Sequence, residues 1–307
     1  MDKKKIVVIG AVNIDICGTS DEQLILYDSN PGVAEYSFGG VGRNIAENLT
    51  RLGAEVHMIT VLADDLFTAD LLKYSEGVGI NFAHSMHVKG ERCSKYLSIN
   101  NNNGDMILAV SDMKIYDLLT AEFIAEQMDF INTCDLAVVD TNVPAEVIEY
   151  ICEHAKIPIA ADPVSINKAD KLRRCLGGLT IIKPNLYETE ELTGIKIEDD
   201  ASLNEAADFF HKRGIKYVFI SMAEEGVYYS DGDTSGTIPI CTAYKVVNVS
   251  GCGDAFLSAV VSSFLKDKTA EEMARYGECA AAICAKSDKT VCEDFTDEHI
   301  SSLLEAF

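Results

Sequence analysis

Lys245-Val-Val-Asn-Val-Ser-Gly-Cys-Gly-Asp-Ala-Phe256 is the stretch of this sequence that most clearly indicates a fold. A short apolar strand is expected to run into a turn flanked by Gly251 and Gly253, and the turn to open a helix from Asp254 through Leu265. The two glycines let successive backbone N–H groups point into one space, where the positive end of the helix dipole adds its partial charge. Such a turn holds an anion, most often a phosphate.

Asp254 stands directly beside this predicted anion site, where its carboxylate would repel the ligand. One interpretation is that the carboxylate takes a proton from a hydroxyl group that attacks the phosphate. The other is that Asp254 only caps the helix, as aspartate often does. The stretch by itself leaves both interpretations open.

The composition is that of a globular protein with a large core, since 48% of the 307 residues are hydrophobic and 24% are charged. A formal net charge of -23 leaves no basic footprint, so neither nucleic acid nor an anionic membrane is expected as a partner. The apolar run Ile6–Ile9 is too short for a signal peptide or a membrane span. Ten scattered cysteines without CxxC pairs are typical of reduced thiols, which predicts a cytoplasmic protein without zinc.

Strands and helices alternate along most of the chain, which predicts an α/β fold with a doubly wound, mostly parallel sheet flanked by helices. Strands are expected over residues 6–10, 56–62, 136–140, 157–161, 179–182 and 217–221. Helices are expected near residues 45–52, 120–129 and 144–155, from 187, over 202–213, and from 254 to the end. A hairpin is expected over residues 226–230 and 237–240.

Two segments depart from this alternation and predict a small second sheet. Residues 16–38 carry weak strand patterning broken by the turn Asp28–Gly32, and residues 92–110 read as a hairpin around Asn101–Gly104. We expect these strands to form a small β-sheet lid inserted in a single α/β domain that spans residues 1–307.

Polar side chains gather where the predicted parallel strands end, which is where such sheets bind ligands. They are Asn13, Asp15, Asp140, Asn142, Asp162, Lys183, Asn185 and Ser221. Any one of these polar residues could simply lie in a solvent-exposed loop. Their accumulation at one edge of the sheet favours a binding site.

Three of the polar features allow two interpretations each. Asn185 and Glu188 form either a helix cap or an amide and carboxylate that organise Mg²⁺ and its waters beside phosphates. Lys183 either meets a phosphate or pairs with a neighbouring acid. The run Gly39-Gly-Val-Gly-Arg-Asn44 is a second backbone cradle, a hinge between lid and main sheet, or both.

Other classes of protein and site fit the sequence less well. A dinucleotide enzyme needs GxGxxG after its first strand, where this chain has Gly10-Ala-Val-Asn13, and Phe256 replaces the third glycine of the later turn. No GxxxxGK[ST] motif occurs, which excludes a P-loop kinase. A non-catalytic nucleoside or sugar sensor could dispense with Asp254 and with a magnesium site. His84 and His87 lack an accompanying acidic or cysteine cluster, so no metal site is expected there.

The sequence resembles the ribokinase-like (PfkB) family of sugar and nucleoside kinases. The resemblance rests on Gly39-Gly40 with Asn44, on Asn185-x-x-Glu188, and on Gly251-x-Gly253-Asp254, which follow in the family's order over nearly the whole chain. It implies transfer of the γ-phosphoryl group of ATP to a primary hydroxyl group. It also implies Mg²⁺ and often a stimulating monovalent cation such as K⁺.

Further runs are similar to the subgroup of this family that phosphorylates pseudouridine. They are Asp28–Gly32, Gly39–Ala46, Ser111–Met113, Asp162–Ser165 with Lys168, Lys183–Asn185 and Val247–Gly251. Cys252 replaces the alanine that is usual in the family, which should leave the backbone cradle intact, and Asn248 replaces a frequent aspartate, as in that subgroup. The resemblance implies the 5′-hydroxyl of pseudouridine as the acceptor. Ribose, adenosine, inosine and guanosine remain alternatives.

The resemblance also implies a role for each site residue. The general base would be Asp254, and the anion hole would consist of Gly251, Cys252 and Gly253. The sugar and base would be held by Asn13, Asp15, Gly39, Gly40, Asn44, Ser94, Tyr96, Asp112 and Lys168. ATP would meet Lys183, Asn185, Ser221, Gly226, Asn248, Gly251 and Gly253, and Mg²⁺ would be organised by Asn185 and Glu188. A homodimer through the lid is the expected assembly.

Overall fold

In residues 3–307, the part of the chain that this computed structural model describes, a nine-stranded sheet forms the centre. Its strand order is β15-β14-β13-β12-β11-β10-β1-β4-β6, and all neighbours from β13 to β6 are parallel. The strands are β1 (Lys5–Ile9), β4 (Glu55–Ile59), β6 (Ile80–Asn81), β10 (Leu136–Asp140), β11 (Ile159–Asp162), β12 (Ile181–Ile182), β13 (Tyr217–Ser221), β14 (Val227–Ser230) and β15 (Ser235–Ile238). Among the described strands of this sheet, only the hairpin β14–β15, at one edge, pairs antiparallel. The mostly parallel sheet predicted from the sequence is therefore confirmed.

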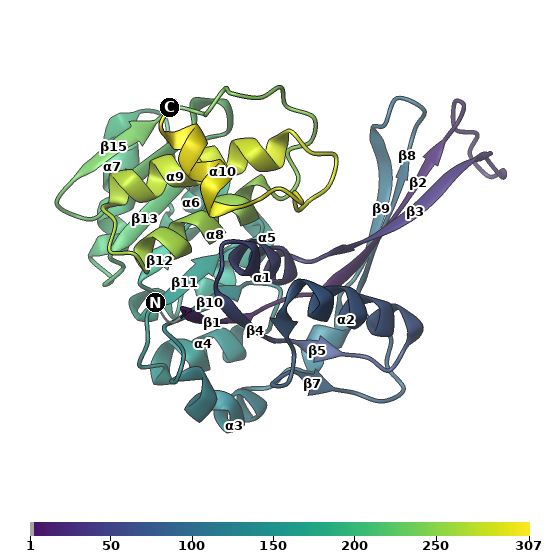
Figure 1. Cartoon of the computed structure of the whole chain (residues 1–307), viewed down its shortest axis with the longest axis horizontal. Coiled ribbons are helices and arrows are strands. Elements are labelled where there is room, and N and C mark those ends of the chain that lie inside the picture. Colours follow the sequence, from purple (N-terminus) through teal and green to yellow (C-terminus); the bar gives the residue numbers. More distant parts are fainter. Residues whose placement is uncertain (1–2) are drawn as a thin grey trace.

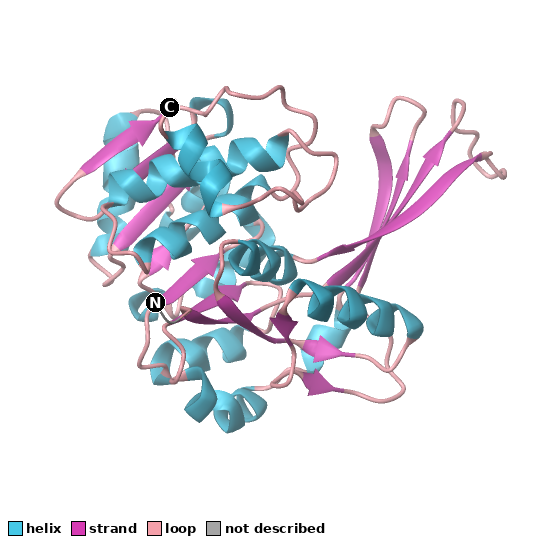
Figure 2. Cartoon of the chain, viewed as in Figure 1, coloured by secondary structure: helices cyan, strands magenta, loops and turns pink. Residues whose placement is uncertain are grey.

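Helices cover both faces of this sheet (Figures 1 and 2). They are α1 (Val41–Arg51), α2 (Leu66–Val78), α3 (Ala121–Ile131), α4 (Ala145–His154), α5 (Ile166–Ala169), α6 (Leu186–Thr193), α7 (Asp200–His211), α8 (Cys252–Phe264), α9 (Ala270–Ala285) and α10 (Asp297–Leu304). Val7 and Ile9 of β1 pack with residues of α3, α4 and α7, whereas Ile6 and Val8 pack with α1 and α8. Because alternate residues of one strand enter two cores, the parallel strands are apolar without interruption.

A second sheet, four-stranded among the described residues, extends away from the body of the molecule (Figure 1). Its order is β3-β2-β8-β9, with β2 (Asn13–Ser20), β3 (Gly32–Gly39), β8 (Lys95–Asn100) and β9 (Met106–Asp112). β2 pairs antiparallel with β3 and parallel with β8, and β8 pairs antiparallel with β9. These strands cover the two segments for which the sequence predicted a small sheet.

Three local predictions are wrong or incomplete. The expected strand before Gly251 is an exposed loop, because the N–H groups of Val247 and Asn248 both donate to the carbonyl oxygen of Ala285 at the end of α9. The expected strand over residues 56–62 splits after Ile59, and its second part, β5 (Val61–Leu62), pairs with β7 (Met86–His87). Helix α2 lies in a segment for which no element was predicted. Local pattern does not reveal which neighbour a short apolar run will find.

No helix among residues 3–307 combines the length and the hydropathy that crossing a lipid bilayer requires.

The carboxylate of Asp140 joins three segments at the carboxyl end of the sheet. Its Oδ2 accepts hydrogen bonds from the N–H groups of Ala11 and Gly42, each at 2.8 Å, and its Oδ1 accepts one from Asn142 at 2.8 Å. A Cβ atom on Gly10 would overlap the carboxylate, so that position requires glycine. The group therefore fixes the end of β1 against the start of α1.

We predict that Asp140→Ala lowers the free energy of unfolding by at least about 3 kcal/mol, because it leaves buried N–H groups without an acceptor, at roughly 1–3 kcal/mol each. Denaturant unfolding followed by circular dichroism measures the loss. Asp135→Ala is the matched control, since Asp135 stands just before the same strand, is half-exposed and accepts from one backbone N–H, that of Lys5. Equal losses in the two variants would contradict this role of Asp140.

Candidate active site

The turn before α8 places Asp254 in the first helical turn. The helix begins at Cys252, two residues earlier than predicted, with Gly251 as the N-cap residue. Gly251 has a φ of 83°, and a Cβ atom there would overlap the carbonyl oxygen of Thr290, so glycine is required. Among the described residues, the Asp254 carboxylate accepts a hydrogen bond from Nδ2 of Asn44 at 2.7 Å and from no backbone amide of α8. In this geometry Asp254 does not cap the helix.

The environment of Asp254 makes it a proton acceptor near neutral pH. Burial raises its pKa to about 7, and the carboxylate of Asp162 adds to the rise. The hydrogen bond from Asn44 and the charge of Lys183 offset part of it. A carboxylate whose pKa lies near the working pH is suited to general-base catalysis.

Three carboxylates lie near the ammonium group of Lys183, those of Asp162, Glu188 and Asp254. Nζ of Lys183 is 3.2 Å from Oδ2 of Asp162, and both side chains are buried. Burial lowers the pKa of Lys183, but the three carboxylates outweigh burial and hold the pKa above its ordinary value. The lysine thus pairs with an acid, the second of the two interpretations. A Cβ atom on Gly253 would lie 2.9 Å from Nζ, so the ammonium group also lies against the turn before Asp254.

Asn185 and Glu188 form a reciprocal cap at the start of α6. The Glu188 N–H donates to Oδ1 of Asn185, and the Asn185 N–H donates to Oε2 of Glu188, both at 2.9 Å. Asn185 and Glu188 therefore do cap the helix. The cap uses one carboxylate oxygen of Glu188 and leaves the other without a hydrogen bond from Asn185. Within residues 3–307 no three His, Cys, Asp or Glu side chains are grouped to hold a metal. A single carboxylate oxygen still fits Mg²⁺, which commonly keeps several waters and takes few protein ligands.

A second polar cluster lies where the small sheet leaves the body, and it contains Asn13, Asp15, Gly39, Gly40 and Asn44. Asn13 is opposite Gly39 across β2 and β3, and its Nδ2 donates to Oδ1 of Asp15 at 2.6 Å. A Cβ atom on Gly39 would overlap the Asp15 carboxylate, and Gly40 has a φ of 94°. Oδ1 of Asn13 is buried and has no hydrogen-bond partner among residues 3–307. This unpartnered acceptor suits a hydroxyl donor from a ligand.

Other predicted sugar or base contacts lie around this cluster. Tyr96 is opposite Asp15 in the pairing of β2 with β8, and Asp112 is the last residue of β9. Lys168, on α5, donates from Nζ to Oδ1 of Asn142 at 2.6 Å. Ser94 is buried, and its hydroxyl donates to the carbonyl oxygen of Val12 at 2.6 Å, which holds β8 at the root of the small sheet.

The predicted ATP contacts lie on the side of α8 and β13. Ser221 ends β13 and forms a bridge with Asn185, so it joins the cap of α6. Gly226 has a φ of 91° and no room for a Cβ atom against the carbonyl oxygen of Ile238. Oδ1 of Asn248 accepts from the Ser250 N–H at 2.9 Å, which shapes the loop before the turn.

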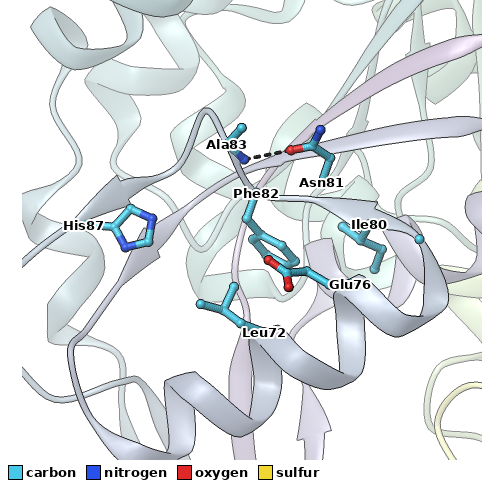
Figure 3. A pocket seen from close by; sticks show the side chains of 8 residues that line it. Leu72, Glu76, Ile80, Asn81, Phe82, Ala83 and His87 are labelled. Carbon is cyan, nitrogen blue, oxygen red and sulfur yellow. Dashed lines mark hydrogen bonds between the residues drawn. The ribbon is translucent and has the colours of Figure 1, made fainter.

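A surface hollow of about 390 Å³ lies between α2 and β6, at the edge of the central sheet opposite β15 (Figure 3). His87 and Glu76 line it, but His84 does not. His84 is stacked on Phe130, with ring centroids 3.5 Å apart, and its Nδ1 is 2.9 Å from Oε1 of Gln127. The two histidines therefore do not converge on one site.

Sequence reasoning missed Arg43, which the structure places against Asn44. Nη2 of Arg43 donates to Oδ1 of Asn44, and Nη1 donates to Oε2 of Glu47. The signal that could have found this buried pair was an arginine and a glutamate four residues apart on one helix.

Comparison with known proteins places these features in a family. The model of the pfkB family of carbohydrate kinases matches residues 3–294. A pseudouridine kinase of Escherichia coli (strain K12) is 34% identical, over 99% of this chain and 97% of its own. A guanosine-inosine kinase of Exiguobacterium acetylicum is 28% identical, over 95% of this chain and 98% of its own. The structure of Arabidopsis thaliana ribokinase complexed with ribose and ATP has the same fold, with a TM-score of 0.85 at 18% identity and 99% coverage of each chain.

We predict that Asp254→Asn is more stable than the wild-type protein at pH 8, and that this advantage is smaller at pH 5. The folded-state pKa of about 7 lies above the ordinary value of 3.8, so wild-type stability falls as pH rises from about 4 through 7 and the cost of the buried charge is complete above that range. The asparagine variant lacks this loss, so its advantage should grow on the order of 2 kcal/mol between the two pH values. Thermal unfolding of both proteins at each pH measures the difference.

Asp199→Asn is the control, because hydrogen bonds from Ser202 lower the pKa of this carboxyl and its linked change lies at more acidic pH. Its effect on stability should be the same at pH 5 and pH 8. An Asp254→Asn variant whose advantage is equally independent of pH would show that the carboxylate is not held at a raised pKa.

Proposed function

The chain belongs to the pfkB family of carbohydrate kinases, and we propose that it transfers the γ-phosphoryl group of ATP to the 5′-hydroxyl of a ribonucleoside, with pseudouridine as the first choice. The observation that carries the proposal is the position of Asp254. Its carboxylate is buried in the first turn of α8, has a pKa of about 7 and accepts a hydrogen bond from Asn44. It thus stands between an anion-binding turn and a cluster suited to a sugar.

In this mechanism Asp254 accepts the proton of the 5′-hydroxyl as the new O–P bond forms and the bond between the β- and γ-phosphates breaks, releasing ADP. The N–H groups of Gly251 and Gly253 at the start of α8 would stabilise the charge on the transferred phosphoryl group, and Lys183 lies beside Gly253. The Cys252 N–H donates to the carbonyl oxygen of Val249 at 3.2 Å and would have to share this bond with the phosphoryl group. Glu188, beside Asn185, would hold Mg²⁺, which would further neutralise the phosphate oxygens. Phosphoryl transfer depends mainly on such positioning and charge stabilisation.

The cluster at the root of the small sheet would hold the ribose. The unpartnered Oδ1 of Asn13 and the carboxylate of Asp15 would accept hydrogen bonds from the ribose hydroxyls, and Gly39 and Gly40 let the backbone approach these side chains closely. Burial raises the pKa of Asp15, whereas the hydrogen bond from Asn13 and the charge of Arg43 lower it. A ribose hydroxyl donating to this carboxylate would replace part of the solvation that burial removes.

The choice of base rests on similarity and on residues near the small sheet. Identity of 34% to a pseudouridine kinase and the local runs named above support pseudouridine. Its C-glycosidic bond leaves an additional ring N–H, which needs an acceptor. Tyr96, Asp112 and Lys168 are the residues we propose to lie near the base or sugar. The similarity to a guanosine-inosine kinase makes those nucleosides the second candidates.

We also propose that the chain is one α/β domain, that the small sheet is its lid, and that two lids pair in a homodimer. The small sheet carries a concentration of exposed apolar side chains, which are Val33, Tyr36, Leu97, Met106, Ile107, Leu108 and Val110. Exposed apolar patches of this kind commonly mark an interface. A lid that closes over the sugar would also keep water from the γ-phosphate. The cytoplasmic location predicted from the sequence suits an enzyme that uses ATP.

The test of the proposed reaction is an ATP-consumption screen of pseudouridine, uridine, guanosine, inosine, adenosine and ribose, with the product identified by mass spectrometry. We expect the highest kcat/KM with pseudouridine. In Asp254→Asn, kcat should fall roughly 10²–10⁴-fold, the usual contribution of a general base, while the affinity for the nucleoside changes little. Near wild-type turnover in this variant would reject Asp254 as the base. Preference for guanosine or ribose would reject the proposed substrate, and binding without turnover of any compound would favour a sensor.

The dimer is tested by light scattering after gel filtration. We expect the mass of two chains for the wild type and of one chain for Leu108→Glu, because a buried carboxylate in the apolar interface is unfavourable. Leu66→Glu on α2 alters a leucine that is also exposed but lies outside the small sheet, and it should remain dimeric. A monomeric wild-type protein would contradict the proposal.

A further inference from the structure

Arg43 is an almost completely buried arginine in the first turns of α1, with 2% of its surface exposed. Its guanidinium group donates in three directions. Nε donates to the carbonyl oxygen of Gly39 at 3.2 Å, Nη1 donates to Oε2 of Glu47, and Nη2 donates to Oδ1 of Asn44. A charge loses its hydration when it is buried, which is unfavourable, so a buried arginine with three directed hydrogen bonds indicates a specific role.

The amide of Asn44 lies between this guanidinium group and Asp254. Its oxygen accepts from Arg43, and its Nδ2 donates to Oδ2 of Asp254 at 2.7 Å. Turning the amide over would place its NH₂ group against the N–H donors of Arg43 and its oxygen against the carboxylate. Both contacts would become repulsive at once, so the guanidinium group determines which end of the amide faces Asp254.

The guanidinium group is itself held from further along α1. Glu47 is fully buried, and its second oxygen, Oε1, accepts from Nη2 of Arg51 at 2.7 Å and from the hydroxyl of Tyr74 at 3.0 Å. Arg43, Glu47 and Arg51 are spaced four residues apart, so one side of the helix carries a continuous row of charges. The row ends at the Asn44 amide.

We propose that Arg43 is a positioning residue that orients the amide of Asn44 so that its NH₂ group holds the carboxylate of Asp254 in place to receive the proton of the acceptor hydroxyl. The inference rests on the proposed role of Asp254 as general base. Arg43 acts through Asn44, since within residues 3–307 its side chain donates hydrogen bonds to Gly39, Asn44 and Glu47 but not to Asp254. The part of its effect that reaches Asp254 should therefore depend on the presence of Asn44.

The test is a double-mutant cycle of Arg43→Lys with Asn44→Ala, measured as kcat with the preferred nucleoside and saturating ATP. Lysine keeps the positive charge beside Glu47 but cannot donate to three acceptors in the planar arrangement of a guanidinium group. We expect Arg43→Lys alone to lower kcat roughly 10- to 100-fold, the scale on which small misplacements reduce catalysis. In the Asn44→Ala background the same change should alter kcat by less than about two-fold, because the group through which Arg43 acts is absent.

Arg51→Lys is the matched control, because it changes the other arginine of Glu47 on the same helix without contacting Asn44. It should leave kcat within about two-fold of the wild type, the usual limit for a change without direct coupling. Unfolding midpoints of all variants show whether each is folded under the assay conditions. Should Arg43→Lys fail to fold, Glu47→Gln, which weakens the anchor of Arg43 while keeping its shape, replaces it in the cycle.

Equal losses of kcat from Arg43→Lys in the presence and absence of Asn44 would overturn the inference, since a merely structural effect is additive. Wild-type kcat in Arg43→Lys would overturn it as well. These outcomes differ from failure of the general-base proposal, which is decided by Asp254→Asn alone. Loss of turnover in Asp254→Asn together with an additive cycle rejects only the role of Arg43.

Discussion

The carboxylate of Asp140 is the interaction on which the geometry of the site depends. A buried carboxylate loses its hydration, and this burial raises the pKa of Asp140. Three backbone N–H groups compensate by donating hydrogen bonds to the carboxylate. Two of those donors, from Ala11 and Gly42, belong to the end of β1 and the start of α1. Because one group holds both segments, Asn13 at the start of β2 and Asn44 in α1 reach the same side of the sheet.

The buried ionisable groups around the start of α8 include more carboxylates than cations. Lys183 is one ammonium group beside the carboxylates of Asp162, Glu188 and Asp254, and its pKa is held above the ordinary value by them. One of the three carboxylates, Asp254, has a pKa of about 7, so its charge changes near neutral pH. A triphosphate brings further negative charge to this place. This imbalance is the physical reason for proposing a divalent cation, and it is how a chain with a net charge of -23 could receive ATP.

The small sheet and the central sheet divide the proposed work between them. In the proposed reaction, the central sheet and α8 would supply the groups that bind an anion and accept a proton, and any phosphoryl transfer needs such groups. The small sheet contributes Asn13 and Asp15 at its root, and Tyr96 and Asp112 lie at the same level on the neighbouring strands β8 and β9. It also exposes several apolar side chains, which is the reason for proposing that it pairs with a second copy.

Local pattern in the sequence determined the type of fold and the outline of the site. Uninterrupted apolar runs alternating with helical periodicity require a parallel sheet with two covered faces, and polar residues after those runs must then share one edge. Gly251 also predicted the turn correctly, because only glycine fits its φ against Thr290, whereas Gly253 lies inside α8.

The tertiary structure alone decided which partner each polar group has. The sequence left Asp254 open between a helix cap and a base, and in the structure its carboxylate accepts from Asn44, which is distant in the chain. The partner of Lys183 was likewise open in the sequence, and in the structure it is Asp162. Val246–Val249 has the pattern of a strand, but this segment bonds to the end of α9 instead of pairing with another strand. Periodicity reports which face of an element is buried, whereas hydrogen bonds and ion pairs join residues far apart in sequence, so their partners are fixed only when the chain is folded.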